Sequence, residues 1–192
     1  MAFLSLVVAC HARAEIADPV RDVKQFNSPR PETAYKIQGV KVVVADYALI
    51  RQDFRETKSW TDSQIDQWLI DSVGYIAGRQ TFANAVNTSI RLEKKSNRVV
   101  SQRAFRPFGY GRALVFKVGS GYIDVKGAGS ASPRQQSHGN GLATTYEALR
   151  EFIFEKKVEQ VFTDAKLRNH TVGGYAVLDY GFNVIHNDGS QS

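Results

Sequence analysis

The segment RALVFKVGSGYIDVK, residues 112–126, decides the fold class of this chain. Apolar and polar residues alternate on both sides of Gly119-Ser120-Gly121, and Leu, Val, Phe and Ile are frequent. Alternation with a period of two is typical of half-buried strands, and glycine and serine between two such runs are typical of a turn. The segment therefore predicts a β-hairpin with strands at 112–118 and 122–126.

The residues after this hairpin predict a glycine-rich loop over 127–141, a helix and two further strands, at 172–180 and 182–185. Thr144 and Glu147 have the spacing of a capping box, so we expect the helix to begin there and to run to about Phe162. Its apolar residues recur at helical spacing and predict a wide buried stripe: Ala148, Leu149, Phe152, Ile153, Val158, Val161 and Phe162. This order of elements predicts an α+β fold, an antiparallel sheet with helices packed on it.

The first half of the chain predicts one more strand and one more helix. Residues 40–44 are mostly β-branched, which favours a strand. A helix is expected over 59–78, because Thr61 and Gln64 form a capping box and an apolar stripe follows, with Gly78 as its terminator. The stripe comprises Ile65, Trp68, Leu69, Ser72, Val73 and Ile76. It predicts packing, not chemistry.

Composition excludes several classes of protein. The 192 residues are 43% hydrophobic and 11% aromatic, which excludes wholesale disorder. One cysteine excludes an internal disulfide framework and a four-cysteine metal site made by this chain alone. The net charge of +6 is too modest to select a partner. The basic run 91–98 lacks interleaved aromatic residues, so we expect a solvated hairpin or helix end there, and no nucleic-acid partner.

The N-terminal residues 1–34 are interpreted as a leader and an extended linker, and residues 35–192 as the folded domain. Residues 3–10 form an apolar run that is too short to span a membrane. No other segment predicts a membrane span. Residues 1–14 fit either an export signal or, as the alternative, a first strand or a flexible end. Because no lysine or arginine precedes the apolar run, we expect a cytoplasmic protein, with export as the alternative.

The residues that carry candidate chemistry cluster between 109 and 151. Gly109, Gly111 and Arg112 precede the first hairpin strand, where glycines allow a ligand to approach the backbone and arginine offers a fork for phosphate oxygens. Lys126 ends the second strand beside Gly127 and Gly129, where an ammonium suits a phosphate.

Two further elements of this cluster lie downstream. Asn140 and Gly141 precede the helix at 144, whose free amides and dipole favour an anion. Glu151, in the second turn of that helix, is placed where its carboxylate reaches Lys126. A strand lysine held by a helix glutamate under glycine-rich cover is how protein kinases clamp a nucleotide.

The same stretch resembles the SelO family, also called YdiU, of kinase-like protein adenylyltransferases. That family has a G-D-G-R-A segment, an L-K-G-[AS]-G segment, a G-D-G loop and a helix with I-R-E-F. Here they read GYGRA (109–113), VKGAG (125–129), GNG (139–141) and LREF (149–152). The chain departs from the pattern at Tyr110 and Asn140, where the family has aspartates, and at Leu142, where it has arginine.

The resemblance implies roles for these residues and an ATP cofactor. Nucleotide would contact Gly109, Gly111, Arg112, Asn140 and Gly141, while Lys126 would bind phosphate with Glu151 as its partner. The family's catalytic residues and Mg²⁺ ligands lie in a second, helical lobe. We therefore expect a kinase-like N-terminal lobe without its C-terminal lobe, and no catalytic or metal-binding residue within this chain.

Two hypotheses of function follow. The first is the ATP-binding N-terminal part of a SelO-like protein adenylyltransferase, which moves AMP from ATP to hydroxyls of Ser, Thr or Tyr in a protein or peptide and is inactive as this chain alone. The second is a non-catalytic kinase-like module that binds a partner enzyme in protein or peptide modification.

Overall fold

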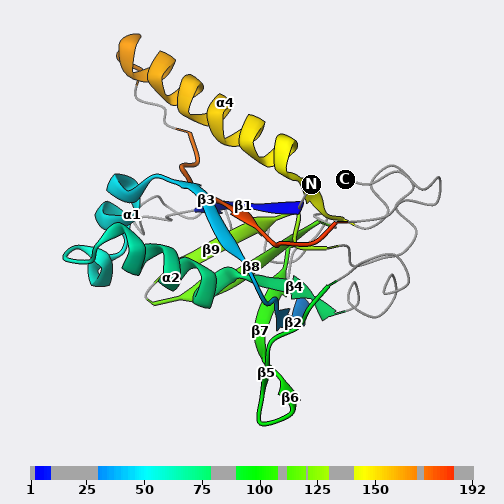
Figure 1. Cartoon of the computed structure of the whole chain (residues 1–192). Coiled ribbons are helices and arrows are strands. Elements are labelled where there is room, and N and C mark those ends of the chain that lie inside the picture. Colours follow the sequence, from blue (N-terminus) through cyan, green and yellow to red (C-terminus); the bar gives the residue numbers. More distant parts are fainter. Residues whose placement is uncertain are drawn as a thin grey trace.

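The structure is a computed structural model that describes residues 30–78, 90–107, 112–119, 121–129, 141–167 and 171–183, together with the backbone of the strand at 3–9. One large sheet forms its centre, with α1 (Tyr47–Asp53) and α2 (Asp62–Val73) on one face and α4 (Thr145–Asp164) on the other (Figure 1). A short 3-10 turn, η3 (Arg55–Thr57), joins the first two helices.

The sheet has the strand order β3-β11-β1-β9-β8-β7-β2-β4, with β10 also paired to β1. Every pairing is antiparallel, which confirms the predicted α+β class with an antiparallel sheet and packed helices. The strands are β1 (Phe3–Ala9), β2 (Arg30–Lys36), β3 (Lys41–Ala45), β4 (Tyr75–Ala77), β7 (Ser101–Arg106), β8 (Ala113–Val118), β9 (Gly121–Lys126), β10 (Ala143–Thr144) and β11 (Gly174–Asp179).

The predicted hairpin is present as β8 and β9, and the predicted strand at 40–44 as β3. The boundary expected at residue 35 differs from the structure at two places. Strand β1 lies between β11 and β9, in agreement with the interpretation of residues 3–10 as a first strand. Strand β2 begins at Arg30 and pairs with β7, so the sheet includes residues that we had assigned to the linker.

Helix α2 supplies one side of the main core. Its capping box at Thr61 and Gln64 is present, and Ile65, Leu69 and Val73 are buried. They pack against the sheet face that carries Leu114, Phe116, Val118, Ile123 and Val125.

The predicted C-terminal end of this helix is wrong. Helix α2 ends at Val73, and the amide of Gly74 closes its last turn on Ile70 O at 3.0 Å. Residues 75–77 then form β4, whose Ala77 N donates to Ala128 O at 2.9 Å. A tyrosine and an isoleucine favour a strand, and sheet pairing outweighs the helical spacing of Ile76.

The basic run 91–98 contains a hairpin, as expected. Strands β5 (Lys94–Lys95) and β6 (Arg98–Val99) flank Ser96 and Asn97, whose φ angles are 50° and 63°. Two successive left-handed residues match a tight hairpin turn.

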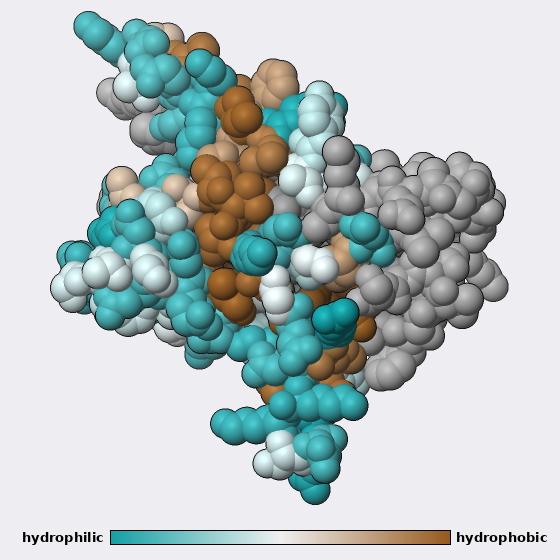
Figure 2. Space-filling model, viewed as in Figure 1, coloured by the Kyte–Doolittle hydropathy of each residue, from teal (hydrophilic) through white to brown (hydrophobic). Residues whose placement is uncertain are grey.

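Helix α4 has the predicted capping box at Thr144 and Glu147, but the predicted wide buried stripe is wrong. Only Ala148 and Phe152 are buried along its 20 residues, where they pack on Val177 of β11. The second half of the helix extends past the sheet (Figure 1). Ile153, Val158 and Val161 are therefore exposed, and apolar surface lies along this helix (Figure 2).

Of the two strands expected at the C-terminal end, the structure contains β11. Phe182 and Asn183 are not part of a strand, and residues 184 and 185 lie outside the described residues. In the part of the chain that the structure describes, the helices are too short or too polar to cross a membrane.

Candidate functional site

The centre of the candidate site is an ion pair between the end of β9 and the second turn of α4. Lys126 Nζ donates to both carboxylate oxygens of Glu151, each at 2.6 Å. The two side chains are 42% and 35% exposed, so the pair is open to a ligand from solvent. The sequence predicted this contact across 25 positions of the chain.

The ion pair depends on how the local sequence places its two partners. The cap at Thr144 fixes the first turn of α4, since the hydroxyl accepts from Glu147 N at 3.1 Å. Lys126 pairs in the sheet with Ala113 of β8 and Leu6 of β1, so its backbone is held from both sides. A cationic side chain on a fixed strand end therefore faces a carboxylate on a fixed helix turn.

Gly127 allows the strand end and the start of α4 to approach closely. Its φ angle is 78°, and a Cβ built there would lie 2.6 Å from Ala143 Cβ. A side chain would thus be both strained and in collision with β10. Gly141, a predicted ligand contact, is buried with φ 66°, and its carbonyl accepts from Gly129 N at 3.3 Å.

Arg112 makes a different contact from the one expected. Its Nη2 donates to Leu142 O at 2.8 Å, and its buried Nε has no hydrogen-bond partner among the described residues. In the structure the guanidinium of Arg112 bonds a backbone carbonyl. That Arg112 contacts a nucleotide stays a prediction. The predicted residues Gly109, Gly111 and Asn140 lie outside the described residues.

Sequence reasoning missed Asp124, which lies two residues before Lys126 on the same face of β9. Burial raises the pKa of its carboxyl to about 6, although the nearby Lys126 ammonium acts in the opposite direction. Its Oδ1 is buried without a hydrogen-bond partner in the described part of the chain. The signal available in the sequence was the period of two, which places Asp124 beside Lys126.

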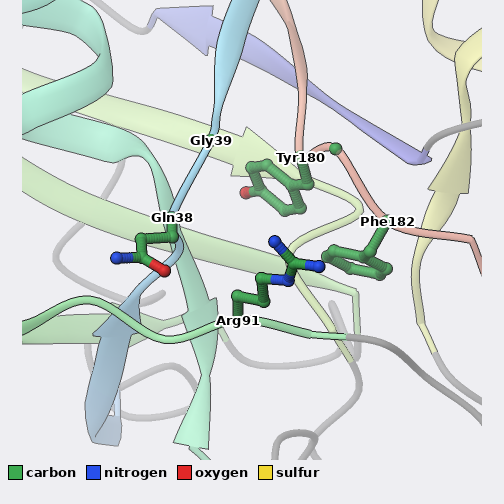
Figure 3. Close-up of a pocket in the computed structure, with 6 residues that line it drawn as sticks. Gln38, Gly39, Arg91, Tyr180 and Phe182 are labelled. Atoms are coloured by element: carbon green, nitrogen blue, oxygen red, sulfur yellow. The ribbon is translucent and has the colours of Figure 1, made fainter.

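A separate hollow of about 240 Å³ lies where the turn between β2 and β3 meets the end of β11. Figure 3 shows the guanidinium of Arg91 directed toward the rings of Tyr180 and Phe182. Tyr180 is fixed by its hydroxyl, which donates to Tyr75 O at 2.9 Å. None of the six lining residues belongs to the predicted site, and the volume is below the range of about 300–1,000 Å³ that is usual for small-molecule pockets.

The described residues contain no group of three or more His, Cys, Asp or Glu side chains arranged to hold a metal ion. Comparisons with protein-family models, with curated proteins and with solved structures found no match to this chain.

Proposed function

We propose that this chain binds ATP as the kinase-like N-terminal lobe of a SelO-like protein adenylyltransferase. The observation that carries the proposal is the ion pair of Lys126 with Glu151, in which Nζ lies 2.6 Å from both carboxylate oxygens. The order of elements around it also supports the proposal. A glycine-rich segment precedes β8, the lysine ends β9, and a second glycine-rich segment leads to the glutamate helix.

The geometry around Lys126 supports the proposal that it binds a phosphate. The carboxylate of Glu151 fixes the position of Nζ, and the remaining exposure of the lysine leaves its charge accessible. An ammonium has three donors, so a lysine that contacts a carboxylate can still donate to a phosphate oxygen. Bound ATP would supply the AMP group, with Mg²⁺ held by residues outside this chain and a protein or peptide as the acceptor.

Titration calorimetry with ATP and Mg²⁺ tests the proposal. We expect Lys126→Met to raise the Kd at least about tenfold, because a hydrogen bond to a charged group contributes about 1.5–3 kcal/mol. Glu151→Gln should have a smaller effect, since it leaves the ammonium in place but less fixed. We expect no AMP transfer by residues 1–192 alone from ATP labelled at the α-phosphate.

Lys156→Met is the matched control, because Lys156 also pairs with a carboxylate, Asp46, at 2.7 Å and lies on α4, the helix that carries Glu151. This variant should bind ATP as the unsubstituted chain does. Equal affinity of the Lys126→Met and unsubstituted chains, or no binding by a folded unsubstituted chain, would contradict the proposal.

A second candidate, a binding module without catalysis, is favoured by the exposed apolar side chains of α4. Ile153, Phe154 and Val161 are each more than half exposed. Exposed apolar surface on a helix often marks a contact with another protein. A folded chain that gives no heat with ATP would favour this candidate over the first.

A further inference from the structure

Arg106, which the candidate site does not yet include, connects two parts of the chain that are rich in glycine. It is the last residue of β7, is 6% exposed, and directly precedes the first glycine-rich segment, residues 107–112. Its Nη1 donates to Ala113 O at 3.3 Å and to Gly129 O at 3.2 Å. One guanidinium therefore bonds the backbone just after the first segment and the backbone within the second, residues 127–141.

The charge of this buried arginine is balanced by Glu32 on β2. Arg106 Nε lies 2.6 Å from Glu32 Oε2, and the two side chains are 7% and 14% exposed. Replacement of a buried ion pair by apolar side chains of similar volume is often neutral or stabilising. The stability of the fold thus gives little reason for a charged residue at position 106. The hydrogen bonds of arginine give a better reason, because its planar guanidinium has five donors and can bond three acceptors at once.

Arg112 makes the complementary contact at the other end of the first segment. Its side chain donates to Leu142 O at 2.8 Å, and its carbonyl accepts from Gly127 N at 2.7 Å. The two ends of the second segment also bond to each other, through Gly129 N and Gly141 O at 3.3 Å. Arg106, directly before the first segment, and Arg112, its last residue, thus bond the backbone near the two ends of the second segment.

We propose that Arg106 is a positioning residue that fixes the base of the second glycine-rich segment relative to the first, beside Lys126. The contact at Gly129 O lies three positions after Lys126, so a shift of Gly129 would be felt at the end of β9. An effect of Arg106 on ATP binding rests on the proposed function. An effect on the backbone of the second segment does not.

Hydrogen exchange of the full chain, read by mass spectrometry, tests the positioning role. Arg106→Lys keeps the charge beside Glu32 but loses the fork, so the amides of residues 127–129 and 141–142 should exchange at least about tenfold faster while those of α2 stay unchanged. Arg103→Lys is the matched control, because Arg103 is exposed on the same strand. It should leave both regions unchanged.

The double variant Glu32→Gln with Arg106→Gln covers the case in which Arg106→Lys does not fold. It removes the fork without leaving a buried charge unpaired, and should accelerate exchange at residues 127–129 and 141–142 in the same way. Unchanged exchange there in either folded variant would overturn the proposal. So would failure of both variants to fold, because that would make the pair a requirement of the whole fold.

The calorimetric titration with ATP and Mg²⁺ gives the second readout. Arg106→Lys should raise the Kd about tenfold while the Tm stays within a few degrees of the unsubstituted chain. If exchange is accelerated but the Kd for ATP is unchanged, Arg106 positions the backbone but does not affect ATP binding, and that part of the proposal is wrong. If the unsubstituted chain does not bind ATP, the proposed function fails, and the exchange experiment still decides the role of Arg106.

Discussion

Helices α2 and α4 begin in the same way but are attached to the sheet by different forces. Both open on a capping box, with Thr61 and Gln64 in one helix and Thr144 and Glu147 in the other. Helix α2 buries an apolar side chain on each of its turns, while α4 buries two in 20 residues.

Polar contacts hold α4 instead. Lys126 pairs with Glu151, and Asp46 pairs with Lys156. Thr171 Oγ1 lies 2.5 Å from Glu155 Oε1 and 2.9 Å from Glu159 Oε2, so its one proton is shared between the two carboxylates. The comparison teaches that one face of the sheet stabilises the fold through apolar contacts with α2, whereas the opposite face carries Asp124 and Lys126 and holds α4 mainly through polar contacts.

The largest expected effect separates the two helices by their apolar side chains. Leu69→Ala in α2 should lower the free energy of unfolding by about 2–5 kcal/mol, since it creates a cavity in a fully buried site. Ile153→Ala in α4 should change it by less than about 0.5 kcal/mol, because that side chain is 55% exposed. Urea denaturation measures both. Equal losses would mean that α4 is as much a part of the core as α2.

The next effect concerns the charged face of the sheet and depends on pH. The pKa of Asp124 is raised from 3.8 to about 6 by burial. The unfolded chain therefore loses this proton at lower pH than the folded chain does, and stability falls as the pH rises from about 4 to about 6. A shift of this size corresponds to at most about 3 kcal/mol.

Asp124→Asn should therefore raise the free energy of unfolding at pH 7.5, with a smaller gain at pH 5. Urea denaturation at the two pH values checks this, with the exposed Asp164→Asn as the comparison. A gain from Asp124→Asn that is equal at both pH values would show that the buried carboxyl of Asp124 does not make the stability depend on pH.

The smallest effect tests the two caps against each other. Thr61→Ala should cost about 1 kcal/mol of global stability, because α2 is part of the core. Thr144→Ala should cost less globally but should speed amide exchange at the start of α4, because a helix with few buried contacts opens locally. Mass spectrometry of exchanging amides separates the two outcomes. Identical behaviour of both variants would show that the two helices are equally coupled to the sheet.

The sequence was sufficient for features that depend on local spacing. The capping box at Thr144 and Glu147 fixes where α4 begins, and one loop joins that point to the end of β9. These two facts were enough to predict the contact of Lys126 with Glu151. The hairpin of β8 and β9 followed in the same way from alternation around a turn.

The sequence did not predict features that depend on pairing between strands distant along the chain. Glu32 and Arg106 are 74 positions apart and meet only because β2 pairs with β7. The exposure of Ile153 and Val161 has a related cause. Helical spacing shows which residues share a face, but it does not show whether the sheet extends far enough to cover them.

The place of β1 in the sheet has a consequence for how the protein folds as it is synthesised. Within β1, Leu6 pairs with Val177 on one side and with Lys126 on the other. Strand β1 is therefore synthesised well before the strands that it pairs with, and contacts between such distant residues form slowly. The hydrogen bonds that join β1 and β3 to β11 close only after β11 has been made, so this side of the sheet is not complete until late in synthesis.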